Sequence, residues 1–127
     1  MLEKEKRQIM CTHTILVVED EDESRQVLMQ ILELEGFKAV GACNGVEAMD
    51  YLHTSDLPCL IIFDLLMPVM NGRQFRAALL QVADLAKIPV VVVSALDSST
   101  VSDLGVVRAL RKPLDIDALV RIVRENC

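Results

Sequence analysis

One carboxylate in this 127-residue chain stands where a carboxylate is costly. Asp64 follows residues 59–63, five consecutive apolar residues of the kind that form a strand buried on both faces. A charge at the end of such a strand costs free energy unless something outside the strand uses it. We therefore expect the functional site at Asp64.

Other polar side chains follow the remaining apolar runs. Glu19 and Asp20 come after Thr14–Val18, Ser94 comes after residues 88–93, and Lys112 comes after residues 106–111. In an open sheet of parallel strands, ligands bind outside the carboxyl ends of the strands. The sequence therefore predicts one shared site made of Glu19, Asp20, Asp64, Ser94 and Lys112.

The residue types at this site indicate phosphoryl chemistry with a divalent cation. Carboxylates about 4 Å apart repel by a few kcal/mol per pair at an effective dielectric near 20, so a cation between them is expected. Hard carboxylate oxygens favour Mg²⁺. Lys112 and Ser94 would contact the oxygens of a phosphoryl group. The neighbouring acids Glu21, Asp22 and Glu23 are interpreted as charges in the first turn of a helix.

The elements that must position these residues alternate between strand and helix. We predict strands at Thr14–Val18 and at 37–43, 59–63, 88–93 and 106–111. Helices are expected after Asp20, after Asn44, from Asn71 through Val82, over residues 97–104, and after Asp115. This pattern predicts one α/β domain, a doubly wound five-stranded parallel sheet with helices on both faces. We assign residues 1–12 to a polar N-terminal lead-in and residues 13–127 to the domain.

Composition excludes several classes of function. The net charge of −6 argues against nucleic acid as a direct partner. No apolar run approaches the roughly 20 residues of a membrane span, and no membrane partner is expected. The four cysteines show no metal-ligand spacing, so we expect reduced structural thiols in a cytoplasmic protein; they are Cys11, Cys43, Cys59 and Cys127.

Four motifs give the chain a family resemblance. Residues 17–21, Val-Val-Glu-Asp-Glu, resemble an acidic pair, and residues 63–72, Phe-Asp-Leu-Leu-Met-Pro-Val-Met-Asn-Gly, resemble a phosphorylation loop. Ser94-Ala95 and Lys112-Pro113 match two further positions. Together they resemble the receiver domain of two-component response regulators, the CheY-like superfamily, over roughly residues 14–126. The resemblance implies a flavodoxin-like sheet of strand order 2-1-3-4-5.

The resemblance also implies a role for each site residue. Asp64 would accept a phosphoryl group from a phosphohistidine of a sensor histidine kinase or phosphotransfer protein, or from a small phosphodonor. Asp20 would bind Mg²⁺ directly, Glu19 through water, and Leu66 through its backbone carbonyl. Ser94 and Lys112 would hold the phosphoryl oxygens, and the Lys112-Pro113 bond is expected to be cis.

The implied molecule is a signalling switch in a phosphorelay. It would not be an enzyme beyond Mg²⁺-dependent self-phosphorylation and autodephosphorylation. Its partners would be the phosphodonor and a downstream protein target or fused output domain, and the chain would be a monomer or weak homodimer. The switching itself is not implied, because Ala109 replaces the family's usual aromatic residue. The segment from Ser94 to Lys112 is also about four residues short, one turn of a shortened fourth helix among five.

A further hypothesis concerns the lifetime of the phosphorylated state. Leu66 and Leu96 stand two residues after Asp64 and Ser94, at positions that influence attack by water in the family. Since both are apolar, no side chain there orients a water, and we expect a long-lived aspartyl phosphate.

Three other functions use some of the same residues. An interaction domain that keeps the fold without being phosphorylated would agree with Ala109 and the short segment before Lys112. A Mg²⁺ phosphatase with an aspartyl-phosphate intermediate would need an acid where Leu66 stands. A flavin-binding domain is disfavoured, because the chain has three Phe, one Tyr and no Trp, and an acidic run replaces a phosphate-binding loop after the first strand.

Overall fold

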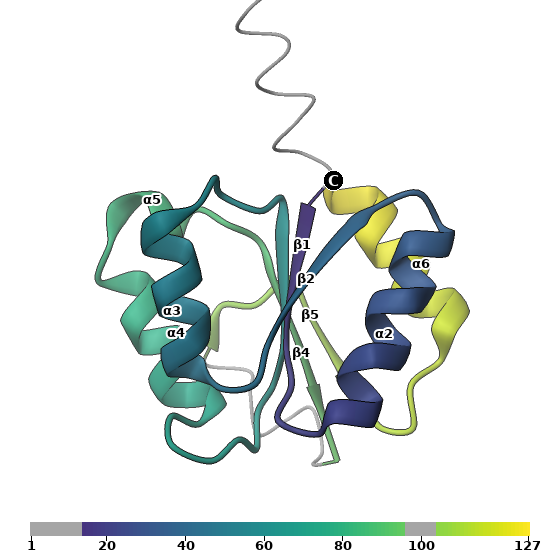
Figure 1. The fold of residues 1–127 in the computed structure, drawn as a ribbon, viewed down its shortest axis with the longest axis horizontal. Helices are drawn as coiled ribbons and strands as arrows, with labels where there is room; N and C mark the ends of the chain where they lie inside the picture. Colours follow the sequence, from purple (N-terminus) through teal and green to yellow (C-terminus); the bar gives the residue numbers. More distant parts are fainter. Residues whose placement is uncertain (1–13, 96–103) are drawn as a thin grey trace, which may run out of the picture.

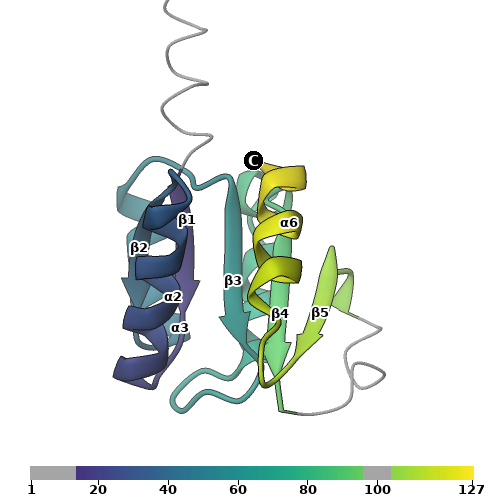
Figure 2. The same cartoon turned by 90° about the vertical axis from the view of Figure 1, so that its right-hand side faces the viewer.

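The computed structural model describes residues 14–95 and 104–127. Five parallel strands form one sheet with the order β2-β1-β3-β4-β5, seen side by side in Figure 2. The strands are β1 (Thr14–Val18), β2 (Lys38–Ala42), β3 (Leu60–Asp64), β4 (Val90–Ser94) and β5 (Arg108–Arg111). The predicted fold class and strand order are confirmed.

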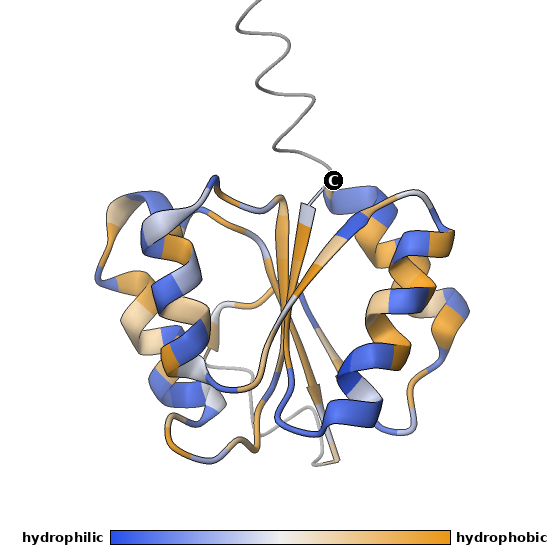
Figure 3. Ribbon diagram, viewed as in Figure 1, coloured by the Kyte–Doolittle hydropathy of each residue, from blue (hydrophilic) through white to orange (hydrophobic). Residues whose placement is uncertain are grey.

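Helices cover both faces of the sheet (Figure 1). One face carries α2 (Asp22–Leu34) and α6 (Ile116–Asn126), and the other carries α3 (Gly45–Thr54), α4 (Gly72–Leu80) and α5 (Ala83–Ala86). In Figure 3 the central strands are almost uniformly apolar, whereas the helices alternate between polar and apolar stretches. This is the pattern of a sheet covered on both faces by amphipathic helices.

Each face of the sheet has its own buried core. Within β3, Ile61 and Phe63 join the cluster under α3 and α4, while Leu60 and Ile62 join the cluster under α2 and α6. Phe63 meets Phe75 of α4 edge to face, with ring centroids 5.2 Å apart. Because both faces of β3 and β4 are buried, these strands need continuous apolar runs.

Side-chain caps begin three of the helices at predicted positions. Asn44, Asn71 and Asp115 each accept a hydrogen bond from a backbone N–H three residues on. At Asn71 the arrangement is a full capping box with Gln74. The predicted helix from Asn71 through Val82 ends at Leu80, however, because the backbone is extended at Val82 before the short α5 begins.

Two apolar helix residues are more exposed than the apolar residues that lie near them at helical spacing. Val27 of α2 and Ile116 of α6 are partly exposed, whereas Leu28, Leu32, Leu119 and Val123 are buried. The predicted helix over residues 97–104 falls outside the described residues except for Leu104, as do the N-terminal lead-in and Cys11. No helix in residues 14–95 and 104–127 is long and apolar enough to cross a membrane.

The expectation of reduced cysteines is wrong for one pair. Cys59, just before β3, forms a disulfide with Cys127 after α6, with Cα atoms 5.4 Å apart and 68 positions between them in sequence. The sequence could not show this pairing, because only the packing of α6 along β3 brings the two residues together. Cys43 is a free, partly buried thiol.

Candidate functional site

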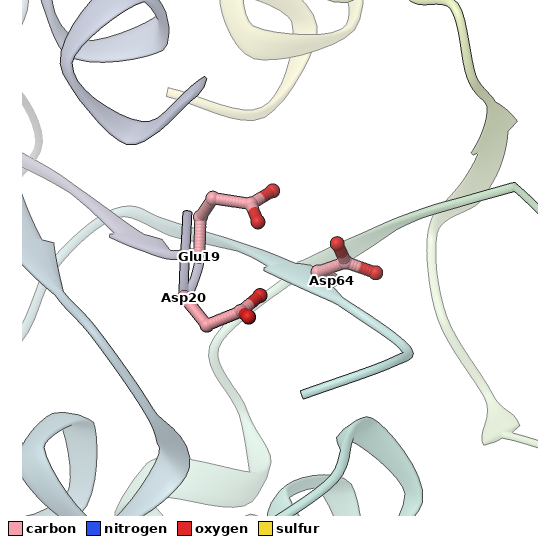
Figure 4. A group of neighbouring side chains, drawn as sticks. All are labelled: Glu19, Asp20 and Asp64. Carbon is pink, nitrogen blue, oxygen red and sulfur yellow. The ribbon is translucent and has the colours of Figure 1, made fainter. Parts of the chain in front are cut away.

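Three carboxylates meet at the carboxyl edge of the sheet. Val18 of β1 pairs with Phe63 of β3, so Glu19 and Asp64 leave adjacent strands side by side. With Asp20, they place one oxygen each within 4.8 Å of the others (Figure 4). Glu19 and Asp64 are buried and Asp20 is exposed, so the group opens to solvent on the Asp20 side.

Lys112 brings a positive charge to the same edge. Its Nζ lies 2.7 Å from Asp64 Oδ2 and 3.2 Å from Glu19 Oε1. Burial lowers the pKa of Lys112, but the hydrogen bonds to both carboxylates and their charges outweigh burial and raise that pKa above its ordinary value. The amine is therefore held in its charged form.

The surroundings of Glu19 raise its pKa and so disfavour its ionised form. Burial raises the pKa and the charge of Asp64 adds to it, whereas the Glu21 N–H and Lys112 oppose the shift. The net pKa lies above its usual 4.5. The site thus holds more negative charge than its own donors balance, and its oxygen-only donor set fits a hard divalent cation such as Mg²⁺.

The turn after β3 orients Asp64. The backbone N–H of Leu66 donates to Asp64 Oδ1 at 3.0 Å. Gly72 N–H donates to the Leu65 carbonyl at 2.8 Å, and a Cβ at Gly72 would lie only 2.6 Å from Leu65 Cα. The close return of the chain at Gly72 therefore requires glycine and fixes the turn that carries Asp64.

Ser94 and Leu66, the two remaining predicted site residues, also lie at the carboxyl ends of the strands. Ser94 is buried at the end of β4, one residue past Val93, which pairs with Asp64. Its carbonyl accepts from Lys112 N–H at 2.8 Å, just before the cis Lys112-Pro113 bond that was expected. Leu66 donates its backbone N–H to Asp64 Oδ1, and its side chain is exposed.

Arg25 is a site residue that the sequence reasoning missed. From α2 its Nη1 donates to the Glu19 carbonyl at 2.8 Å, and its Nη2 pairs with Asp22. The side chain passes over Gly41, where a Cβ would lie 3.0 Å from Arg25 Cδ. Arg25 therefore fixes the backbone that presents the acidic pair.

A groove of about 630 Å³ adjoins the acidic group. Its lining includes the charged Glu19 and Lys112 together with apolar side chains, among them Val27 and Ile31 of α2 and Ile116 of α6. The partial exposure of Val27 and Ile116 is thus accounted for, because both line this groove.

Comparison with known proteins gives a consistent result. The family model described as the response regulator receiver domain matches residues 15–124. The response regulator Rre1 of Synechocystis sp. is 38% identical over 116 residues, which is 87% of this chain and 50% of Rre1. The CpxR homolog of Haemophilus influenzae, a transcriptional regulatory protein, is 33% identical over 85% of this chain and 48% of its own length. The chain thus spans about half the length of these curated relatives.

Solved structures show the same fold. A response regulator receiver protein from Pseudomonas putida superposes with a TM-score of 0.84 at 33% identity, covering 90% of this chain and 97% of that chain. The chemotaxis response regulator CheY4 of Vibrio cholerae has a TM-score of 0.82 over 91% and 99% of the two chains, and at 23% identity it supports the fold alone. With the acidic group and Lys112 at the carboxyl edge of this sheet, the chain belongs to the response regulator receiver domain family.

Proposed function

We propose that this chain is a phosphorylatable switch in a two-component phosphorelay, formed by residues 13–127. One observation carries the proposal: Asp64 lies within 4.8 Å of two further carboxylates, and Lys112 Nζ contacts it at 2.7 Å. A nucleophilic carboxylate, a hard-cation site and a fixed ammonium group are the parts that phosphoryl transfer needs.

In the proposed reaction an oxygen of Asp64 attacks phosphorus. The bond from phosphorus to the imidazole nitrogen of a phosphohistidine breaks as the new bond to oxygen forms, and the imidazole leaves. In the structure Leu66 N–H donates to one Asp64 oxygen and Lys112 Nζ to the other, and each oxygen keeps a further lone pair for the attack. Lys112 then binds an oxygen of the transferred group, and the Ser94 hydroxyl donates to another.

Mg²⁺ would be held by Asp20 and Asp64, by Glu19 through water, and by the Leu66 carbonyl. The bound ion would neutralise charge on the carboxylates and on the phosphoryl oxygens. The exposure of Asp20 beside two buried acids supports this assignment, because it leaves one side of the group open to the ion and the donor.

The phosphodonor is proposed to be a sensor histidine kinase or a phosphotransfer protein. The groove between α2 and the start of α6 supports a protein donor, since its lining combines apolar side chains with Glu19 and Lys112. A downstream protein or a fused output domain would read the state of Asp64, and the chain would act in the cytoplasm as a monomer or weak homodimer.

The exposed Leu66 side chain supports a slow loss of the phosphoryl group. It is 55% exposed beside Asp64 and offers no polar atom to orient a water. Leu96, the other residue of this hypothesis, lies outside the described residues. An unchanged dephosphorylation rate in a Leu66→Asn, Leu96→Glu variant would remove the hypothesis.

The deciding experiment is intact mass spectrometry after incubation with acetyl phosphate and Mg²⁺. We expect a gain of one phosphoryl group that is lost in Asp64→Asn and lost when EDTA removes the metal. A chain that binds no Mg²⁺ and gains no mass would instead be an interaction domain that works without phosphorylation.

A further inference from the structure

Arg76 is an unusual residue for the interior of a small domain. It lies in the middle of α4, yet only 6% of its surface is exposed. Arginine is seldom buried to this extent unless a carboxylate pairs with it. None of the ion pairs among residues 14–95 and 104–127 includes Arg76.

The guanidinium group instead binds backbone far away in sequence. Its Nε donates to the Leu104 carbonyl at 2.9 Å and its Nη2 donates to the Gly105 carbonyl at 3.0 Å. The remaining nitrogen, Nη1, is buried without a hydrogen-bond partner in the described part of the chain. Arg76 thus ties α4 to the backbone just ahead of β5.

Stability alone does not explain this arrangement. Burial lowers the pKa of Arg76, because desolvation disfavours the charged form. A well-packed apolar side chain of similar volume is often as stable as a buried charge or more so. The specific benefit of arginine is its rigid fork, which holds two acceptors in a fixed geometry.

The backbone is shaped to meet that fork. Gly105 has a φ of +65°, in the left-handed region, and it lies against the guanidinium, with a Cβ position 3.7 Å from Arg76 Nη2. The carbonyls of consecutive residues point in opposite directions in an extended chain. The turn at Gly105 lets the carbonyls of Leu104 and Gly105 face the same group.

This contact lies at the start of a short strand at one side of the sheet. β5 has four residues and pairs only with β4, at the edge of the sheet. Its first link is the Val107 N–H to the Val90 carbonyl at 2.9 Å, two residues after Gly105. At its other end Arg111 is followed directly by Lys112. The register of β5 against β4 therefore sets the position of the Lys112 backbone.

We propose that Arg76 is a positioning residue for Lys112: by holding the Leu104 and Gly105 carbonyls it fixes the start of β5, and β5 places Lys112 Nζ on Asp64. The consequence for phosphorylation rests on the proposed function. The consequence for the strand does not, because it concerns only backbone hydrogen bonds.

The first test measures amide hydrogen exchange in Arg76→Leu. This variant fills the buried position with an apolar side chain that suits a helix, and it removes the guanidinium group. We expect the N–H groups of Val107 and Lys112, bonded to Val90 and Ser94, to exchange at least tenfold faster relative to global unfolding. The matched control is Leu52→Ala in α3, a buried residue of the same core cluster. It lowers stability without touching β5, and should not single out these two amides.

The second test measures the rate of phosphorylation by acetyl phosphate with Mg²⁺, at a temperature where every variant is folded. A displacement of about 1 Å can cost about 100-fold in rate, so we expect Arg76→Leu to be at least tenfold slower than wild type. Leu52→Ala should react at the wild-type rate. Arg76→Lys keeps the charge but lacks the guanidinium group, so its rate should lie between those of Arg76→Leu and wild type. It replaces Arg76→Leu in this test if that variant does not fold.

A double-mutant cycle shows whether the effect passes through Lys112. In a Lys112→Ala background, Arg76→Leu should cause no further loss of rate. Wild-type exchange at Lys112 N–H together with a wild-type rate in Arg76→Leu would overturn the inference, as would a full additional loss in the Lys112→Ala background. If the wild-type protein gains no phosphoryl group, the proposed function fails, and the exchange experiment still decides whether Arg76 positions β5.

Discussion

The Nζ atom of Lys112 lies 2.7 Å from Oδ2 of Asp64, and it reaches Oε1 of Glu19 at 3.2 Å. One ammonium group therefore serves two buried carboxylates that leave neighbouring strands. Since two carboxylates this close repel each other, Lys112 is the cation that offsets their negative charge when no metal is bound.

Replacing Lys112 by methionine should destabilise the metal-free protein. The change leaves two buried acceptors without a charged donor, and an unsatisfied buried polar group costs about 1–3 kcal/mol. We expect that loss in the free energy of unfolding, measured with urea in EDTA. It should shrink when Mg²⁺ is added, because the ion replaces the lost positive charge. If the loss of unfolding free energy were equal with and without Mg²⁺, the charge of Lys112 and the bound cation would act independently of each other.

Magnesium should stabilise the wild-type protein against heat. Ion bound only by the folded state stabilises it by about 2.7 kcal/mol at one hundred times its dissociation constant. We expect the rise in melting temperature to disappear in Asp20→Asn, which removes one charge from the group. Glu23→Gln removes the same charge from the first turn of α2, outside the three-carboxylate group, and should keep the full Mg²⁺ effect. An effect that survives Asp20→Asn would place the ion elsewhere.

The raised pKa of Glu19 predicts a particular pH dependence of stability in EDTA. A carboxyl whose pKa is higher in the folded state than its usual 4.5 contributes stability below that value and loses it as pH rises through the folded pKa. The glutamine of Glu19→Gln does not titrate, so it avoids this loss. The variant should gain stability relative to wild type as the pH rises from 4 to 8.

Urea unfolding of both proteins across this range measures the difference directly. The titrating groups that do not contact Glu19 are shared by the two proteins, so their contributions cancel between the two curves. A stability difference that is flat with pH, or that favours wild type increasingly toward pH 8, would contradict the raised pKa.

Much of the fold followed from local pattern. The strand Thr14–Val18 was predicted at its observed bounds, and β3 and β4 were recognised because burial on both faces demands unbroken apolar runs. The caps at Asn44, Asn71 and Asp115 marked helix starts for a local reason, a side-chain oxygen bonded three residues ahead. Glu19, Asp20, Asp64 and Lys112 meet because parallel strands bring their carboxyl ends to one edge.

What could not be predicted depends on contacts between distant segments. Nothing near Arg76 in sequence indicates that its side chain reaches Leu104 and Gly105, 28 and 29 positions away. The exposure of Val27 and Ile116 follows from the groove between two helices, while their spacing alone indicated a buried face. The strand order itself came from family resemblance, because alternation of strand and helix does not fix it.

Val69, in the loop after Asp64, should be a site of removable strain. Its φ of 68° is left-handed, a conformation that costs an L-residue about 1–2 kcal/mol and is especially unfavourable for a β-branched one. The side chain is exposed and loses little packing on replacement. Val69→Asn should therefore raise the free energy of unfolding by about 1 kcal/mol, since asparagine tolerates this region. The control Val46→Asn, at an exposed helical valine, should give no gain; a similar gain there would point to surface polarity instead of backbone strain.

The Cys59–Cys127 disulfide should stabilise the domain without affecting its chemistry. It closes a loop spanning 68 positions, for which chain entropy predicts a stabilisation of about 4 kcal/mol. Cys127→Ser should lose that amount under oxidising conditions, and dithiothreitol should lower wild type to the level of the variant. Cys43→Ser, which removes a free thiol, should behave as wild type in both conditions.

The rate of phosphorylation in oxidised and reduced protein tests whether the disulfide affects the site at Asp64. Cys59 precedes β3 and Asp64 ends it, so the disulfide lies at the opposite edge of the sheet from the carboxylates. Below the melting temperature of the reduced protein, reduction should therefore leave the rate of phosphorylation by acetyl phosphate unchanged. Peptide mapping that finds both cysteines as thiols in oxidised protein would contradict the bond itself. A rate that falls on reduction would show instead that the C-terminal end of α6 communicates with Asp64.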